Sequence, residues 1–312
     1  MSDFYKKRVE YINNWPESEP FEAEIEYKKL CDDFKEKNGR LPFTPMEMWE
    51  SPDVIYNRVL SHIIECLEVI PYEPNHAFNY LFLSFDHFSK EKYQKDTTSN
   101  LKCFCEIIMS PSDSKKIIEK ILSELFNTIP LDLCKYLYKQ ICTVTKNKKG
   151  NETKQVFTRI STNSNNKPIK DYEDFLNSII NKYDYSDDDK RRKAARLLQK
   201  IFKKESIILN EKEIDNNIEL QLALLLSGVI YSLRNDSLHG SSMSSTKSSE
   251  TDNGRYASNY YSFISIYVLL MLLLIEGSFS DEKEKETYYN ELLIVTKKNI
   301  ADFKSLFQKY LE

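Results

Sequence analysis

The sequence predicts an all-α fold. Gly is rare, with 6 residues in 312, which disfavours turn-rich all-β folds and Gly-rich nucleotide-binding loops. Leu, Ile, Lys, Glu and Tyr dominate the composition, and apolar residues recur at helical spacing along most of the chain. No internal repeat has a period between 20 and 50 residues. We therefore expect a helical bundle with additions to it.

Helical segments follow one another along the chain, separated by Pro, Gly and polar stretches. Asn38-Gly39 is a suitable end for the second segment, and Asp187-Asp188-Asp189 suits the beginning of a later one. The first two segments are expected on the surface of the protein. The expected helices cover residues 3–15, 20–38, 52–69, 75–93, 99–109, 112–128, 129–142, 171–183, 188–204, 211–239, 256–276 and 281–311.

Two polar stretches interrupt this series. Residues 143–170 are rich in Asn, Lys and Thr and predict a long loop or a short hairpin inserted between helices, in which QVFTRIST (155–162) is a candidate strand. Residues 240–254, GSSMSSTKSSETDNG, consist mostly of Ser, Thr and Gly. Such a segment lacks the apolar side chains of a core, so we expect it to be mobile.

The bulk composition excludes several classes of protein. The net charge of −4 disfavours an extended nucleic-acid coat, while a small local site for one or a few nucleotides remains compatible with it. The six cysteines form no C-x-x-C pair, the spacing that is typical of zinc sites. They predict free thiols, and we expect no metal and no other cofactor.

The compartment follows from the N-terminus and from one apolar segment. The first fifteen residues are charged throughout and contain no apolar signal region, so we expect a protein of the reducing cytoplasm. Residues 256–275 are uncharged, but serines and an asparagine interrupt their first half. The unbroken apolar run, 266–275, is shorter than the roughly 20 residues that a bilayer requires. We expect a central core helix and no membrane span.

The stretch LRNDSLHG, residues 233–240, holds the candidate catalytic residues Arg234, Asn235 and His239. A guanidinium binds two phosphate oxygens, and an imidazole gives or takes a proton near neutral pH. Arg234 and His239 lie about 140° apart around an ideal helix, so they converge only if the last turn loosens before Gly240. Asn235 and His239 share a face, and Asn235 is expected to orient the imidazole or hold a phosphate oxygen.

At these residues the sequence resembles the HEPN superfamily, whose small helical bundles carry an R-x4-6-H motif near the end of a core helix. RNDSLHG matches the motif, including Asn235 after the arginine. The upstream segment HAFNYLFLSFDHFSK (76–90) is similar to an early HEPN helix, and residues 256–276 are similar to the helix that follows the motif. The resemblance covers roughly residues 75–278. It implies an N-terminal helical extension, residues 1–72, and a HEPN-like domain, residues 73–312, with an insertion at about 92–205.

The resemblance also implies a function. Many HEPN proteins are metal-independent endoribonucleases that serve in phage defence or in toxin–antitoxin pairs, and they often pair two motifs in one dimer. It implies that Arg234 and His239 are catalytic, that Asn235 supports them, and that the substrate is single-stranded RNA. The expected partners are a second copy of the chain and an antitoxin or regulatory protein. The alternative is a non-catalytic HEPN-like module that binds a partner protein or a nucleotide.

The remaining candidates favour structural roles. His62, His76 and His87 lie in helical segments, and we expect core or surface histidines rather than metal ligands. Two small basic clusters, NKKG (147–150) and KRRK (190–193), are typical of solvated surfaces, with contact to RNA as the alternative.

Overall fold

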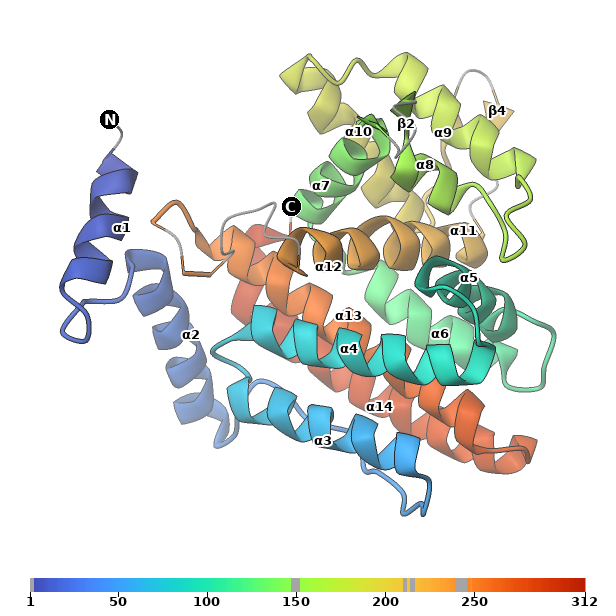
Figure 1. The fold of residues 1–312 in the computed structure, drawn as a ribbon, viewed down its shortest axis with the longest axis horizontal. Helices are drawn as coiled ribbons and strands as arrows, with labels where there is room; N and C mark the ends of the chain where they lie inside the picture. Colours follow the sequence, from blue (N-terminus) through green and yellow to red (C-terminus); the bar gives the residue numbers. More distant parts are fainter. Residues whose placement is uncertain are drawn as a thin grey trace.

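The apolar segment near residue 260 forms the central helix of the molecule. In the computed structural model, which describes residues 3–146, 152–209, 212–213, 217–238, 246–247 and 249–311, helix α13 spans Asn253–Ser278. Every side chain from Ser262 to Ile275 is at most 2% exposed. α13 is the one described helix that is long and apolar enough to cross a membrane, and 83% of that apolar window is buried inside the protein. The expectation of a core helix is confirmed (Figure 1).

Four helices surround α13 in one half of the molecule. α4 packs between α13 and α3, and α14 packs between α13 and α6. Capping residues set where they begin, because Asp53 and Asp281 accept hydrogen bonds from the first free backbone N–H groups of α3 and α14, and proline opens α4. Their bounds are Val54–Val69 for α3, Pro74–Tyr93 for α4, Lys115–Phe126 for α6 and Glu282–Phe307 for α14.

The other half contains shorter helices and the helix that carries the R-x4-H motif. This motif helix, Ile218–Leu238, begins as α11 (Ile218–Ala223), widens into the π-helical segment η1 (Leu224–Ile230) and ends as α12 (Tyr231–Leu238). Helix α7 packs against η1 on one side and against α10 on the other. The remaining helices there are α5 (Thr97–Ile108), α7 (Leu131–Cys142), α8 (Gln155–Ile160), α9 (Lys170–Lys182) and α10 (Asp188–Phe202).

The all-α prediction is confirmed, since helices make up 73% of the structure. The strands are two antiparallel ladders of two residues per strand, β1 (Thr145–Lys146) with β2 (Glu152–Thr153), and β3 (Ile208–Leu209) with β4 (Lys212–Glu213). The first ladder is the short hairpin that the sequence left open as an alternative to a loop.

Two of the predicted elements are wrong. Gln155–Ile160 is the helix α8, and not a strand, because Val156 and Ile160 are buried together on one face of a helical turn. The motif helix begins at Ile218 and not near residue 211, because the side chain of Asn217 accepts a hydrogen bond from the Leu220 N–H at 2.7 Å and caps the helix there.

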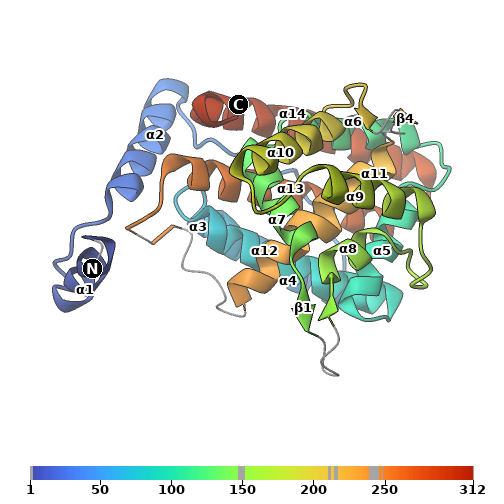
Figure 2. The same ribbon diagram turned by 90° about the horizontal axis from the view of Figure 1, so that it is seen from above.

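The N-terminal helices differ from each other in their packing. Helix α1 (Asp3–Asn13) stands away from the bundle in both ribbon views (Figures 1 and 2). Helix α2 (Glu22–Asn38) was predicted on the surface, yet its Tyr27 is 1% exposed and stacks on Tyr256 of α13, with ring centroids 4.1 Å apart. One face of α2 therefore belongs to the core.

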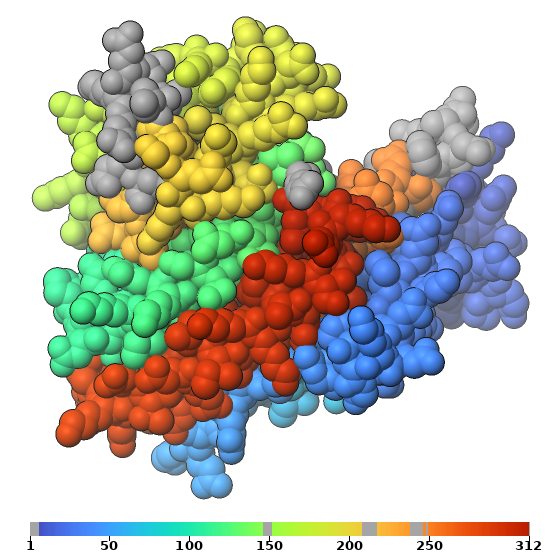
Figure 3. Space-filling model, turned by 180° about the vertical axis from the view of Figure 1, so that it is seen from behind, coloured from blue at the N-terminus to red at the C-terminus, as the bar shows by residue number. Residues whose placement is uncertain are grey.

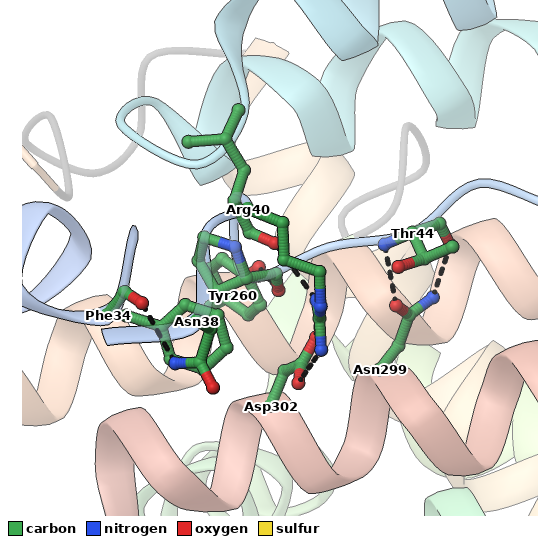
Figure 4. A network of polar contacts seen from close by, with 9 residues as sticks. Phe34, Asn38, Arg40, Thr44, Tyr260, Asn299 and Asp302 are labelled. Atoms are coloured by element: carbon green, nitrogen blue, oxygen red, sulfur yellow. Dashed lines mark hydrogen bonds and ion pairs between the residues drawn. The ribbon is translucent and has the colours of Figure 1, made fainter. Parts of the chain in front are cut away.

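Polar contacts fasten the link after α2 to the last helix. Arg40 donates two hydrogen bonds to Asp302, at 2.6 and 2.8 Å, and Asn299 bonds the backbone N–H and C=O of Thr44 at 2.8 and 2.9 Å (Figure 4). A single cluster of buried apolar residues runs from Ala23 to Phe307. The division into an N-terminal extension, residues 1–72, and a second domain, residues 73–312, stays a prediction. The apolar core is continuous across this boundary.

Candidate functional site

Arg234 lies in α12, and none of the described residues supplies an acidic partner for its charge. Its guanidinium carbon lies 5.6 Å from the ring centre of Phe82 on α4 and 5.9 Å from that of Tyr231. Its Nη1 donates to Oδ1 of the adjacent Asn235 at 3.0 Å, and its Nε is buried without a hydrogen-bond acceptor. Among the described residues, no carboxylate lies within ion-pair distance of it.

The three candidate residues differ in what the structure says of them. Arg234 and Asn235 are both half-buried and bonded to each other. His239 lies outside the described residues, so its convergence with Arg234 stays a prediction. The expected role of Asn235 changes in one respect, because its carbonyl oxygen accepts the bond from Arg234 and thereby orients the guanidinium.

Neighbouring helices hold the end of α12 in place. Asp236 accepts hydrogen bonds from the hydroxyl of Tyr136 at 2.8 Å and from the amide of Gln140 at 3.2 Å, both on α7. Asn79 of α4 donates to the hydroxyl of Ser237 at 3.3 Å. Burial and then the nearby Asp236 carboxylate raise the pKa of Tyr136, so its hydroxyl stays a donor at neutral pH. The motif is therefore fixed between α4 and α7.

A second arginine, Arg159, lies beside Tyr231, the tyrosine that Arg234 also contacts. The sequence analysis did not identify it as a candidate. Arg159 of α8 is 7% exposed, and its guanidinium carbon lies 4.5 Å from the ring centre of Tyr231. Its Nε donates to the backbone oxygen of Ser227 and its Nη2 to the hydroxyl of Ser232, each at 2.7 Å. Burial lowers the pKa of Arg159 to about 10, which leaves it charged at neutral pH.

The π-helical segment makes this contact possible. A π-helical turn carries one extra residue and offsets the regular hydrogen-bond ladder. The carbonyl of Ser227 lies in this turn and accepts the bond from Arg159. Gly228 lets α7 approach, because a Cβ atom there would lie 2.5 Å from Cδ1 of Leu137. No periodicity in the sequence distinguishes a π turn from an α turn, so this part of the site could not be predicted.

Two uncompensated guanidinium groups near one aromatic ring define an anion-binding environment. Charged groups taken out of water are normally paired with an opposite charge, and neither arginine has one among the described residues. Arg159 is almost fully enclosed, whereas Arg234 is half-buried and keeps part of its surface exposed. A phosphate is an anion that a guanidinium binds through two parallel bonds.

The segment after the motif is anchored where it is described, contrary to the expectation of a mobile stretch throughout 240–254. Thr246 is 1% exposed and its hydroxyl bonds Oδ1 of Asn75 at 3.1 Å. Lys247 forms ion pairs with Glu24 of α2 and with Glu73, the latter at 3.0 Å. Although burial lowers the pKa of Lys247, its bonds to these two carboxylates outweigh burial and raise it. Polar contacts anchor Thr246 and Lys247, which the composition of the stretch predicts to be mobile.

Comparison with known proteins adds nothing to this geometry. The chain matches no protein-family model, no curated protein and no solved structure. In the part of the chain that the structure describes, no group of three or more His, Cys, Asp or Glu side chains converges as metal ligands would. Any assignment of function rests on the residues around Arg234.

Proposed function

We propose that this chain is a metal-independent endoribonuclease of the HEPN type that cleaves single-stranded RNA. Arg234 and His239 are the catalytic residues, and Asn235 supports them. The observation that carries the proposal is the guanidinium of Arg234, which is fixed at the end of a core helix, half-buried, and free of any carboxylate within the described ranges. The buried charge of Arg159 strengthens the positive potential at this place.

The reaction is the attack of a ribose 2′-hydroxyl on its own 3′-phosphate. The bond between the 2′-oxygen and phosphorus forms, the bond between phosphorus and the 5′-oxygen breaks, and the strand ends in a 2′,3′-cyclic phosphate and a 5′-hydroxyl. A base removes the 2′-hydroxyl proton, an acid protonates the leaving 5′-oxygen, and an imidazole serves in either role. Arg234 balances the charge that gathers on the crowded phosphate.

We further propose that the enzyme acts as a homodimer. One chain supplies one motif histidine, and the reaction uses both an acid and a base. A two-fold pairing of motif helices places two copies of His239 at one cleft. The biological setting that fits such an enzyme is phage defence or a toxin–antitoxin pair, with an antitoxin or regulatory protein as its natural partner.

The test is cleavage of labelled single-stranded RNA by the purified chain. Arg234→Ala and His239→Ala should each lower cleavage by at least ~100-fold, the scale expected for an acid–base or charge-stabilising group. Arg255→Ala, which removes an exposed arginine from the first turn of α13, is the matched control and should cleave as the wild type does. The chelator EDTA should leave the wild-type rate unchanged.

Each outcome separates the alternatives. If both variants cut as well as the wild type, Arg234 and His239 are structural and the proposal fails. Binding of RNA or of a nucleotide without cleavage by the wild type would identify a non-catalytic module. If the protein is a monodisperse monomer whose cleavage rate per chain does not change on dilution, the homodimer proposal is wrong and the nuclease proposal still stands.

A further inference from the structure

The outer face of α10 concentrates positive charge in a protein of negative net charge. Residues 190–204 contain eight of the chain's 44 lysines and arginines and no Asp or Glu. Five of the eight lie within an arc of about 100° around the helix axis: Arg192, Lys193, Arg196, Lys200 and Lys203. The other basic cluster of the sequence, residues 147–150, lies outside the described residues. All members of the group that we call the α10 basic face are exposed: Arg192, Lys193, Arg196, Lys200, Lys203 and Lys204.

The opposite face of α10 is apolar and belongs to the core. Ala195, Leu198 and Phe202 are fully buried, and the ring of Phe202 lies 5.8 Å from that of Phe126 on α6. Packing against α7 holds the helix in this orientation. The basic face is therefore turned to solvent, and the atoms of α10 form part of the surface in the space-filling view, in yellow (Figure 3).

An ordinary solvated helix face does not explain this composition. Pairs such as Arg192 with Arg196 and Arg196 with Lys200 are four residues apart, where like charges repel and destabilise a helix. Lys200 pairs with Glu205 at 3.6 Å, and within the described residues no other member of the basic face has a carboxylate at ion-pair distance. The face carries a cost in stability that internal ion pairs do not offset.

The basic face is one helix away from the candidate site. α10 packs on α7, and Tyr136 and Gln140 of α7 bind Asp236 in the motif itself. Figure 2 shows α10 on the outside of the bundle, in front of α7. Successive positive charges that follow one helix suit an extended polyanion, because each neutralised phosphate releases condensed counterions.

We propose that the α10 basic face binds the phosphate backbone of single-stranded RNA and holds the strand whose scissile phosphate lies at Arg234. This inference rests on the proposed function for the identity of the polyanion. The positions of the charges carry the rest, together with the finding that, among the described residues, only Lys200 of this face has an acidic partner.

The experiment measures RNA binding by the full chain with Arg234→Ala, which prevents cleavage. A fluorescent single-stranded RNA is titrated by anisotropy at several salt concentrations. Arg196→Glu together with Lys203→Glu should weaken binding by at least ~10-fold and make the salt dependence shallower, since fewer phosphates are neutralised. The matched control is Lys297→Glu with Lys304→Glu, which has the same charge change and spacing on the exposed face of α14, and it should change affinity less than ~2-fold.

Thermal unfolding of the same proteins shows whether a loss of binding is a loss of fold. The α10 variant should be at least as stable as its parent, because the carboxylate introduced by Arg196→Glu would face Arg192 and Lys200 as opposite charges. Equal loss of RNA affinity in the two double variants, or none in either, overturns the inference. Capture of phosphatidylserine vesicles through α10, with RNA affinity equal to the control's, also overturns it.

The failure of this inference is distinct from failure of the nuclease proposal. If the wild-type chain binds RNA through α10 but does not cleave it, the nuclease proposal is wrong and the proposal for the α10 basic face is supported. The opposite result contradicts the basic face and leaves the nuclease proposal standing: the wild-type chain cleaves RNA, and the two α10 substitutions change neither cleavage when made in the wild-type chain nor RNA binding when made in Arg234→Ala.

Discussion

Two arginines beside one tyrosine perform different tasks because their burial differs. Arg159 is enclosed, and its bonds to Ser227 and Ser232 fasten α8 to the motif helix. Arg234 is half-buried and, among the described residues, makes one hydrogen bond, to its sequence neighbour Asn235. A buried donor that fastens two helices contributes to stability, whereas a charged group without a partner at a helix end is available for a ligand.

This contrast gives a prediction for the free energy of unfolding. Arg159→Met keeps much of the side-chain volume but leaves the Ser227 carbonyl and the Ser232 hydroxyl without their donor, so it should lower stability by about 1–3 kcal/mol. Arg234→Ala loses the cation–π contacts with Phe82 and Tyr231 and one hydrogen bond at a helix end, and should lower the stability by less than ~1 kcal/mol. Urea titrations of both variants provide the comparison. Equal losses would mean that Arg234 is as structural as Arg159.

At the scale of elements, the sequence predicts the long helices. It does not predict short elements such as α8, whose conformation depends on contacts with residues far away in the sequence. The helices from α2 to α7, and α9, α10, α13 and α14, follow from apolar periodicity and capping residues. Helix α8 is six residues long, too short to show a period, and its Val and Thr favour a strand. Its helical form depends on burial and on Arg159, a contact that reaches 68 residues along the chain. The R-x4-H motif can be recognised in the sequence because its residues lie within six positions, and its role stays a prediction, whereas no sequence pattern indicates Arg159.

The π-helical segment leads to a prediction about Gly228. A methyl group at this position would lie 2.5 Å from Cδ1 of Leu137 and 3.2 Å from Cδ1 of Ile160, and both side chains are at most 1% exposed. Overpacking of this kind typically costs about 1–3 kcal/mol, and the better helix propensity of Ala offsets about 1 kcal/mol. Gly228→Ala should therefore lower the stability by roughly 1 kcal/mol and displace α7 from the motif helix. An unchanged melting temperature together with unchanged RNA cleavage would show that α7 adjusts freely.

At the scale of the whole molecule, the core is unusually rich in tyrosine. Eight of the 20 tyrosines are less than 2% exposed, and several donate a hydroxyl bond to a backbone oxygen, as Tyr261 does to Leu125 at 2.9 Å. These bonds satisfy polar atoms in an otherwise apolar interior, and the one from Tyr261 connects α13 to α6. The same hydroxyl groups make the fold sensitive to alkali.

The sensitivity to alkali follows from the pKa values of these tyrosines. Burial raises the pKa of Tyr56 to about 12 from an ordinary value near 10, and burial likewise raises the pKa values of Tyr27, Tyr260 and Tyr261. Above pH 10 the unfolded chain loses phenol protons that the folded chain retains. Stability is therefore fully present below about pH 10 and is lost as the pH rises toward 12.

We expect cooperative unfolding in this window rather than gradual titration. Each retained proton lowers the free energy of unfolding by about 1.4 kcal/mol per pH unit, and the total stability of a domain is of the order of 5–15 kcal/mol. Several buried tyrosines together therefore reduce the free energy of unfolding to zero soon above about pH 10. Phenolate absorbance near 295 nm should rise in the same narrow step in which the helical circular-dichroism signal disappears. Smooth titration of all 20 tyrosines around pH 10 with helical signal retained would show that the interior hydroxyls reach solvent in the folded protein, against the burial on which the core depends.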